Sequence, residues 1–434
     1  MALSTAQEDK WALGADEPAR WTVMVFMGAD KIPGNADLLP EAKKTIEAMK
    51  QVIAAMREKS SEKSKTEGVP QKDLKAEPLN IFVHLHSEGR LQRLHVGKGD
   101  LEPADLSQED ATNGNALTSL IAWAVRENSH RRKDYSMLVM WGHSYLFGVG
   151  PQTLQYGIDA LDFAELSDVL ERFQRNHKKK YAADYPGDEQ PKLDIVAFDA
   201  CDLATVEMAY QLQPFANYLL ASQIGVPLPG WPYEKVLTRL ADPMGVLMGP
   251  AELGSYVARR FCEFYAADDR AKPVTMSVLD LKRALSLFDL TESLARRIAI
   301  VISNDDDEMD LVYRLFLQSR TPDGRPFIDV ADFCVHLIRN SRYDHVREAA
   351  RQLGNLLVSP HPDATGGSEN GAKKPFIVEN CRNSAETAGM NGVSLYAPHV
   401  SDNDFQTALH FYEKFLFAQK TLWSELVHGL ALPV

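Results

Sequence analysis

The sequence predicts an α/β fold in which a mostly parallel sheet carries helices on both faces. Near-continuous apolar runs at 21–27, 79–86, 135–143 and 193–201 indicate strands that are buried on both sides. Segments with helical spacing of apolar residues separate them, as crossover connections between parallel strands require. A chain of 434 residues with 45% hydrophobic and 25% charged residues has the composition of a globular protein.

Strands and helices alternate through the first half of the chain. Residues 1–20 are expected to form a flexible lead-in, and the Lys-, Ser- and Glu-rich stretch Arg57–Lys75 a solvated, mobile insertion. The Gly-rich stretch 144–153 is expected to be a loop beside the site. The other expected elements are strand Trp21–Met27, helix Leu39–Met56, strand Leu79–His86, edge hairpin strand Leu91–Val96, helix Asn115–Glu127, strand Tyr135–His143, helix Leu161–Phe173, strand Leu193–Cys201, helix Leu203–Leu212 and strand Tyr218–Gln223.

The second half is richer in helical patterns. We place a soft boundary near residue 250, which divides a core at 21–250 from an α-rich region at 251–434 that contributes to the same fold. The expected elements are helix Glu252–Tyr265, strand Val274–Asp280, helix Ala284–Ile302, several helices between Asp305 and Leu357, a loop at Thr365–Lys374, strand Asn391–Ala397 and a terminal helix Phe405–Gln419.

Charge and cysteine usage exclude several classes of protein. The formal net charge of −13 argues against nucleic-acid partners, because nothing offsets phosphate repulsion. No apolar run reaches the roughly 18 residues of a membrane helix, and the polar start of the chain lacks a signal-peptide pattern. The four widely spaced cysteines form neither a metal motif nor a disulfide framework. We therefore expect a cytoplasmic protein with no membrane partner and no resident metal.

Two predicted strands end in residues that suit nucleophilic catalysis. Cys201 ends one buried run and His143 ends another, 58 residues earlier, which leaves room for one crossover helix. Reactive groups gather at the carboxyl ends of strands in open α/β sheets. If the strands are parallel neighbours, the imidazole meets the thiol and serves as its base. We therefore predict a Cys-His dyad.

The stretches that surround these residues resemble the clostripain-like cysteine peptidases, relatives of caspases. The resemblance rests on WTVMVFMGAD at 21–30, VMWGHS at 139–144, FDACDLATVEMAY at 198–210 and LLASQIGVPLPGWPYEKVL at 219–237. Weaker matches follow at 274–281 and 391–398, so the similarity spans nearly the whole chain in the family's order. It implies a caspase-like sheet and a cysteine endopeptidase that acts on proteins or peptides.

The resemblance also assigns roles to residues. It makes Cys201 the nucleophile and His143 the general acid/base, with the amides of Ser144 and Cys201 holding the oxyanion. Family members cleave after Arg or Lys, and their acidic pocket residue corresponds to Asp199. Three departures from the family pattern are Ser144 in place of Gly, Gln223 in place of an acid, and a Pro-rich loop before Trp231. The candidate pocket residues are Asp199, Ser222, Gln223 and Trp231.

Regulation by cleavage is common in this family, by the enzyme itself or by an upstream activating protease. The basic cluster Arg172–Lys180 is expected to be a loop and offers the processing candidates Arg172, Arg175, Lys178, Lys179 and Lys180. No cofactor is expected for the chemistry, although some members depend on calcium. The acidic run Asp305–Glu308 fits a solvated helix start better than a calcium site.

Other interpretations remain open at the sequence level. The same fold could serve as a catalytically inactive binding or regulatory module, with Ser144 and the Pro-rich loop as marks of decay. Retention of both His143 and Cys201 argues against it. A nucleotide-binding enzyme using Gly142, Gly148 and Gly150 is a weaker alternative, because these glycines do not match G-x-G-x-x-G.

Overall fold

A nine-stranded sheet forms the centre of the molecule. The computed structural model describes residues 20–31, 36–67, 78–103, 114–128, 134–145, 148–149, 161–242, 248–267, 272–358, 375–399 and 412–431. The strand order is β13-β11-β10-β9-β5-β1-β2-β3-β4. The five inner strands from β10 to β2 run parallel, and the strands at both edges are antiparallel. The predicted α/β class with a mostly parallel sheet is confirmed.

The parallel strands lie where the apolar runs predicted them. Their bounds are β1 Trp21–Gly28, β2 Leu79–Ser87, β5 Tyr135–Trp141, β9 Leu193–Asp199 and β10 Ala216–Ala221. The antiparallel strands are β3 Arg90–His95, β4 Glu102–Pro103, β11 Thr275–Asp280 and β13 Ile377–Arg382.

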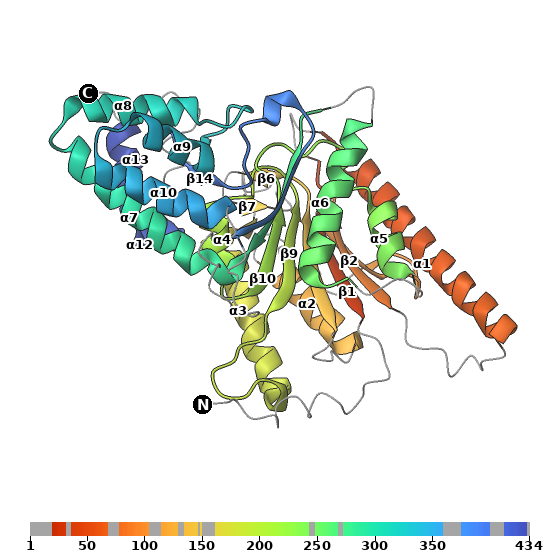
Figure 1. Ribbon diagram of the computed structural model, residues 1–434. Helices are drawn as coiled ribbons and strands as arrows, with labels where there is room; N and C mark the ends of the chain where they lie inside the picture. The colour runs from red at the N-terminus through yellow and green to blue at the C-terminus, as the bar shows by residue number, and fades with distance from the viewer. Residues whose placement is uncertain are drawn as a thin grey trace.

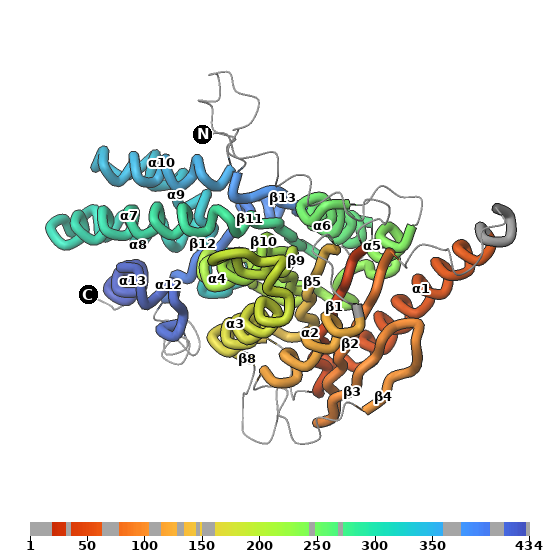
Figure 2. The backbone as a smooth tube through the Cα atoms, turned by 90° about the horizontal axis from the view of Figure 1, so that it is seen from below, coloured from red at the N-terminus to blue at the C-terminus, as the bar shows by residue number. Residues whose placement is uncertain are grey.

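Helices cover both faces of the sheet because its strands alternate their side chains between two cores. Val23 and Val25 of β1 pack into one core, and Met24 and Phe26 into the other. Helices α1 Leu39–Glu67, α5 Tyr233–Ala241 and α6 Pro250–Ala266 cover the first face. Helices α2 Asn115–Asn128, α3 Phe163–Lys180 and α4 Val206–Leu212 cover the second (Figure 2).

The C-terminal region extends the second core beyond one end of the sheet. Its helices stand together on the left of Figure 1, while β11 and β13 join the central sheet. The helices are α7 Ala284–Ile302, α8 Asp306–Gln318, α9 Val330–Asn340, α10 Asp344–Val358, α12 Leu416–Lys420 and α13 Trp423–Ala431. A second sheet pairs β12 Phe327–Asp329 with β14 Ser394–Tyr396.

Several expectations need correction. Helix α1 continues to Glu67, so the first part of the expected insertion Arg57–Lys75 is helical. Of the expected terminal helix at 405–419, the first seven residues lie outside the described part, and the described remainder is interrupted before α12, which α13 follows. Strand β13 and helix α5 were not anticipated. The lead-in before residue 20, most of the stretch 144–153 and the loop at 365–374 lie outside the described residues.

The basic cluster at 172–180 is helical and not a loop. It occupies the last turns of α3, whose N-terminus is closed by a capping box between Asp162 and Glu165. Lys178, Lys179 and Lys180 lie in the final turn, where cations interact favourably with the helix dipole. A protease binds extended chain, so cleavage in this cluster requires these turns to unwind.

Candidate active site

The ends of β5 and β9 place His143 and Cys201 at the same edge of the sheet. The two strands are adjacent and parallel, and Trp141 is the register partner of Asp199. His143 lies two positions after the last residue of β5, and Cys201 lies two positions after the last residue of β9. The pairing and direction of these strands are those predicted from the sequence.

Gly142 sets how the chain leaves β5. Its φ of +142° lies in the region that favours glycine, and an added Cβ would lie 2.7 Å from the carbonyl oxygen of Gly28. Its amide donates to the carbonyl of Asp199 at 3.3 Å, so the two strand ends remain tied together. The glycine before His143 is therefore required by the backbone.

His143 is half-buried and suited to act as a base. Nε2 lies 3.4 Å from the carbonyl oxygen of Ala36. Burial lowers the pKa of the imidazole below 6.5, and the Ala36 hydrogen bond partly opposes this shift. The ring is consequently neutral near pH 7, which is the form that accepts a proton.

The Cys201 thiol contacts the chain that follows β10. The Val226 amide donates to Sγ at 3.2 Å, and Sγ lies 3.9 Å from the Val226 carbonyl oxygen. Burial and then the nearby Asp202 carboxylate raise the pKa of the thiol, while Val226, Arg325 and Ser144 lower it. The protonated thiol therefore predominates at neutral pH in this form, and formation of the thiolate depends on a base.

Asp199 lies under the loop between β10 and α5. The carboxylate is 4% exposed, and its Oδ2 accepts from the Trp231 amide at 3.1 Å. Oδ1 is buried without a hydrogen bond of normal geometry, although the Tyr233 hydroxyl is near enough to lower the carboxyl pKa slightly. Burial is the larger effect and raises the pKa of Asp199 to about 7. A buried acid with an unpaired oxygen suits a cationic partner.

Gly230 closes the space over this carboxylate. Its φ is +84°, and an added Cβ would lie 2.7 Å from Oδ2 of Asp199. The Tyr265 hydroxyl donates to the carbonyls of Pro227 and Gly230, at 2.6 and 3.1 Å. These contacts hold the loop against Asp199, and Trp231 is buried with it.

Ser222 and Gln223 are fully buried, and their side chains are hydrogen-bonded to distant parts of the chain. Ser222 is fully buried, and its hydroxyl lies 3.0 Å from that of Thr275. The Gln223 amide nitrogen donates to Asp329 and Ser394, both at 3.0 Å, and its oxygen accepts from the Gly392 amide at 2.6 Å. Because every polar atom of the Gln223 side chain is paired, its position does not support the expected contact with substrate.

An ion pair next to Cys201 was not anticipated from the sequence. Asp202 has a φ of +59°, and its Oδ2 forms an ion pair with Nε of Arg325 at 3.3 Å. Arg325 comes from the loop between α8 and β12, far away in sequence. A positive φ at a non-glycine residue is not visible in a single sequence, and neither is a pairing over 123 residues.

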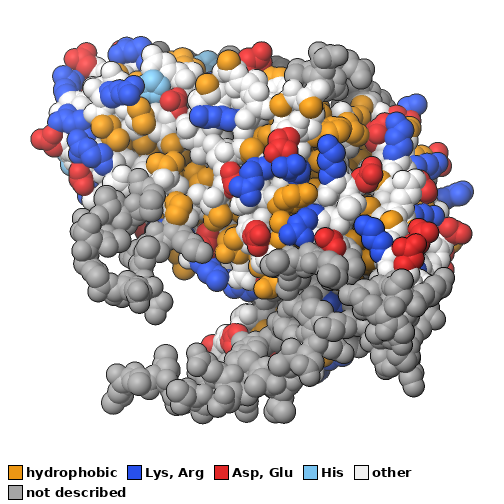
Figure 3. Space-filling view, turned by 45° about the vertical axis from the view of Figure 1, so that its right-hand side comes forward, with side chains coloured by type: hydrophobic (Ala, Val, Ile, Leu, Met, Phe, Trp, Pro, Cys, Tyr) orange, Lys and Arg blue, Asp and Glu red, His pale blue; other side chains and the backbone are white. Residues whose placement is uncertain are grey.

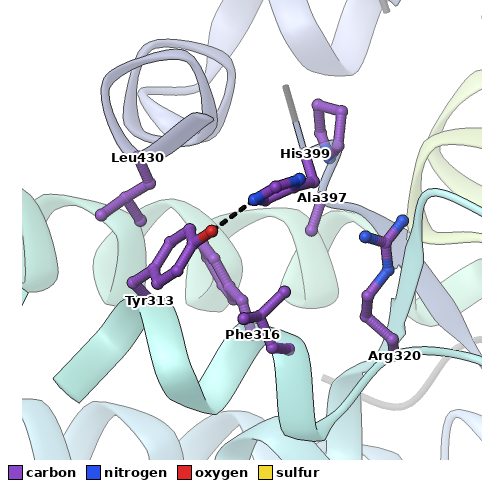
Figure 4. A pocket seen from close by; sticks show the side chains of 8 residues that line it. Tyr313, Phe316, Arg320, Ala397, His399 and Leu430 are labelled. Carbon is purple, nitrogen blue, oxygen red and sulfur yellow. Dashed lines mark hydrogen bonds between the residues drawn. The ribbon is translucent and has the colours of Figure 1, made fainter. Parts of the chain in front are cut away.

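Other features of the described residues lie apart from this edge. A pocket of about 10 Å³ beside α8 contains a hydrogen bond between Tyr313 and His399 (Figure 4). A second pocket, of about 130 Å³, lies between α2 and α3. Neither pocket is lined by His143 or Cys201.

On the face in Figure 3, basic and acidic side chains are interspersed.

The described residues contain no group of three or more His, Cys, Asp or Glu side chains that could hold a metal ion. Asp305 is the N-cap of α8. Its Oδ1 accepts a hydrogen bond from the Glu308 amide at 3.2 Å, and its carboxylate pairs with Arg342. The acidic run is thus a helix start in the structure. Within the same residues, no helix is both long and apolar enough to span a membrane.

Comparison with solved structures shows the same fold in several proteases. A secreted C11 cysteine protease from Bacteroides thetaiotaomicron, "iotapain", superimposes with a TM-score of 0.59 at 14% identity, over 93% of this chain and 99% of that one. An inactive zymogen C11 protease from Parabacteroides distasonis gives 0.58 at 14% identity, over 93% and 98%. A Bacteroides thetaiotaomicron C11 protease in complex with an irreversible peptide inhibitor gives 0.53 at 16%, over 92% and 98%.

Sequence comparison gives the family directly. No curated protein matches the chain. A sequence model of the clostripain family, however, matches residues 65–428, which is most of the chain and includes both strand ends described above. Cysteine proteases of this family need no cofactor for catalysis. The chain belongs to the clostripain family of cysteine proteases.

Proposed function

We propose that this protease cleaves peptide bonds after Arg or Lys through a dyad of Cys201 and His143. The observation that carries the proposal is the register of β5 and β9, which brings the two residues out at one edge of the sheet. The raised pKa of the thiol requires a base, and the lowered pKa of His143 supplies a neutral one. Near neutral pH the thiol is therefore protonated and the imidazole is neutral, which are the forms that proton transfer from Cys201 to His143 requires.

The reaction then follows the usual course of acyl transfer to a thiol. His143 takes the Cys201 proton, and the thiolate attacks the substrate carbonyl. The amides of Ser144 and Cys201 stabilise the oxyanion. The protonated imidazole next gives its proton to the leaving amine, and water hydrolyses the thioester.

Preference for basic substrates rests on Asp199. Its Oδ1 is buried without a normal hydrogen bond, so a guanidinium or ammonium would satisfy an unpaired acceptor. The Gly230–Trp231 segment covers the carboxylate, and substrate entry therefore requires this segment to shift. The protein partners that follow are substrates with Arg or Lys at the cleaved bond.

The deciding experiment compares wild-type protein with Cys201→Ala. Wild-type protein should hydrolyse peptides that contain Arg or Lys, and the variant should have no turnover above background. Cys262→Ala is a matched control, because this buried thiol lies on α6. Turnover retained by Cys201→Ala would overturn the assignment. Wild-type protein inert toward all such peptides, and unlabelled by a peptidyl inhibitor, would favour the inactive binding module.

We also propose regulation by cleavage of the chain. Since the basic cluster at 172–180 is helical, cleavage there depends on unwinding of the end of α3. Intact-mass measurement of purified wild-type and Cys201→Ala protein tests this. Fragments in the wild type alone indicate self-processing. Intact chains in both, together with activation after addition of another protease, indicate an upstream activating protease.

A cytoplasmic location remains a proposal as well. It is supported by the cysteines, all four of which are free. Two of the similar proteases are described as secreted, which makes the question worth testing. Fractionation of the producing cells followed by detection with an antibody distinguishes the two locations.

A further inference from the structure

A buried carboxylate lies directly beside the proposed nucleophile. Asp202 follows Cys201 in the chain and is 5% exposed. Its left-handed φ of +59° and the hydrogen bond from its amide to the Ile224 carbonyl, 3.3 Å, fix its backbone. Oδ1 is buried without a hydrogen bond of normal geometry. Burial raises the pKa of Asp202 well above its ordinary value and the nearby Asp323 adds to this rise, whereas Arg325 opposes it and favours the ionised carboxylate.

An anion at this position opposes catalysis by a thiolate. Two negative charges in a poorly solvated site repel each other, so an ionised Asp202 disfavours the ionised form of Cys201. In the structure, burial and then the Asp202 carboxylate raise the pKa of the Cys201 thiol. A cysteine protease with an acid here therefore needs a compensating positive charge.

Arg325 supplies that charge from the C-terminal region. Its Nε lies 3.3 Å from Oδ2 of Asp202, whose side chain is 7% exposed, while the guanidinium side chain is 47% exposed. The turn that carries it is held by Asp323, which accepts from the Thr321 hydroxyl at 2.8 Å and from the Arg325 amide at 3.3 Å. The Arg320 guanidinium donates to the Arg325 carbonyl at 3.3 Å. A hydrogen-bonded turn thus holds the Arg325 guanidinium beside Asp202.

We propose that Arg325 is a positioning residue for the protease reaction, which pairs with Asp202 and so allows the neighbouring Cys201 to ionise. The proposal rests on the assignment of Cys201 as nucleophile. The groups that act on the thiol are Asp202 on its own segment, Arg325 from the turn before β12, Ser144 after β5 and the Val226 amide. Asp323 acts on Asp202, and His143 lies at the same sheet edge as the thiol. Among these named groups Arg325 is the one permanent cation.

The experiment measures ionisation of the thiol directly. The rate of alkylation of Cys201 by iodoacetamide is followed against pH, using the mass of the peptide that contains Cys201, which separates it from the other three cysteines. Arg325→Gln should raise the apparent pKa of Cys201 by about one unit, since an opposite charge within a few ångströms shifts a pKa by about 1–3. Alkylation near pH 7 should slow about tenfold. Arg325→Lys should slow it less.

Removal of the acid should reverse the effect. In the double variant Asp202→Asn with Arg325→Gln, the anion that needs compensation is gone, and the apparent pKa should return most of the way to the wild-type value. Arg320→Gln tests disturbance of the turn alone and should leave the profile unchanged. Melting temperatures of all variants establish that each is folded.

Two results would overturn the proposal. One is an unchanged alkylation profile in folded Arg325→Gln protein. The other is an equal shift in Arg320→Gln, or a shift in Arg325→Gln that Asp202→Asn does not reverse, because either would show that the turn acts through its shape. Alkylation requires no substrate, so failure here is distinct from failure of the protease assignment, which peptide cleavage by wild-type and Cys201→Ala protein tests separately.

Discussion

Trp141 and Asp199 face each other as register partners in the parallel pair β5 and β9. Because His143 and Cys201 each follow two residues later, the alignment of these partners determines where the imidazole and the thiol emerge. Gly142 connects the two strand ends through its hydrogen bond to the Asp199 carbonyl. The same residue, Asp199, thus ends the strand that precedes Cys201, and its side chain is buried under the Gly230–Trp231 segment.

Replacement of His143 by Ala should remove the base. The loss in kcat/KM is expected to be about 100- to 10,000-fold, the usual contribution of general acid–base catalysis. Since burial lowers the pKa of His143, the corresponding acid limb of the wild-type pH–rate profile should lie below pH 6.5. Steady-state kinetics on a peptide substrate with an uncharged residue at the cleaved bond would check this limb. A limb above pH 6.5 would contradict it.

Asp199→Asn should weaken binding of Arg and Lys peptides most. The wild-type carboxyl has a pKa of about 7, raised by burial, so in the free enzyme it loses its charge as pH falls below about 7. The KM for basic peptides should therefore rise in wild-type protein between pH 8 and pH 6, and this dependence should be absent in Asp199→Asn. Measurement of KM across this range tests both. An unchanged preference in the variant would place the pocket charge elsewhere.

The same substitution should change the pH dependence of stability. The folded-state pKa of Asp199 is raised above the unfolded value, so the stability associated with this group is fully present below the unfolded pKa of about 3.8 and is lost as pH rises to about 7. Asp199→Asn removes this loss. Urea unfolding should find the variant more stable than wild type at pH 8, by on the order of a few kcal/mol, with the difference shrinking toward pH 5. A constant difference would mean that the carboxylate is paired in the fold.

Two substitutions at Ser144 test whether its backbone amide stabilises the oxyanion. Ser144→Pro removes the donor and should lower kcat by about 100- to 1,000-fold with a smaller change in KM. Ser144→Ala keeps the amide and is the matched control, expected to lose much less. Similar losses in the two variants would assign the effect to the hydroxyl or to the turn, against the assignment.

Gln223→Met should affect stability and leave specificity alone. The substitution removes hydrogen bonds to Asp329, Ser394 and Gly392 and leaves buried groups unpaired. We expect the free energy of unfolding to fall by about 1–3 kcal/mol for each group left unsatisfied. The ratio of kcat/KM for Arg and Leu peptides should remain that of the wild type. A changed ratio in folded protein would return Gln223 to the pocket.

The sheet could be predicted because burial on both faces leaves a strong pattern in the sequence. The runs that became β1, β2, β5 and β9 are almost wholly apolar, and the reactive residues come directly after them. The prediction of a loop at the basic cluster 172–180 was wrong. Its polar composition suggests a loop, whereas a capped, amphipathic helix begins 9 residues before Arg172 and continues through the cluster. The helix expected to end at Phe173 continues to Lys180.

The rest depends on contacts that no local pattern records. Strand β13 has a mostly half-buried edge position, and it is held by pairing with β11 about 100 residues earlier. Gln223 and Asp329 are 106 residues apart in the sequence, and Asp202 pairs with Arg325 of the turn before β12. Such long-range polar pairs determine which candidate residues are available to a substrate.

The central claim is that Cys201 is the nucleophile of a protease that prefers basic substrates. Incubation with a peptidyl-lysine chloromethyl ketone, followed by peptide mapping, tests it most directly. We predict one adduct, on Cys201, which is reduced in His143→Ala and in Asp199→Asn. Failure to label Cys201, or labelling of Cys262, Cys334 or Cys381 in its place, would contradict the account.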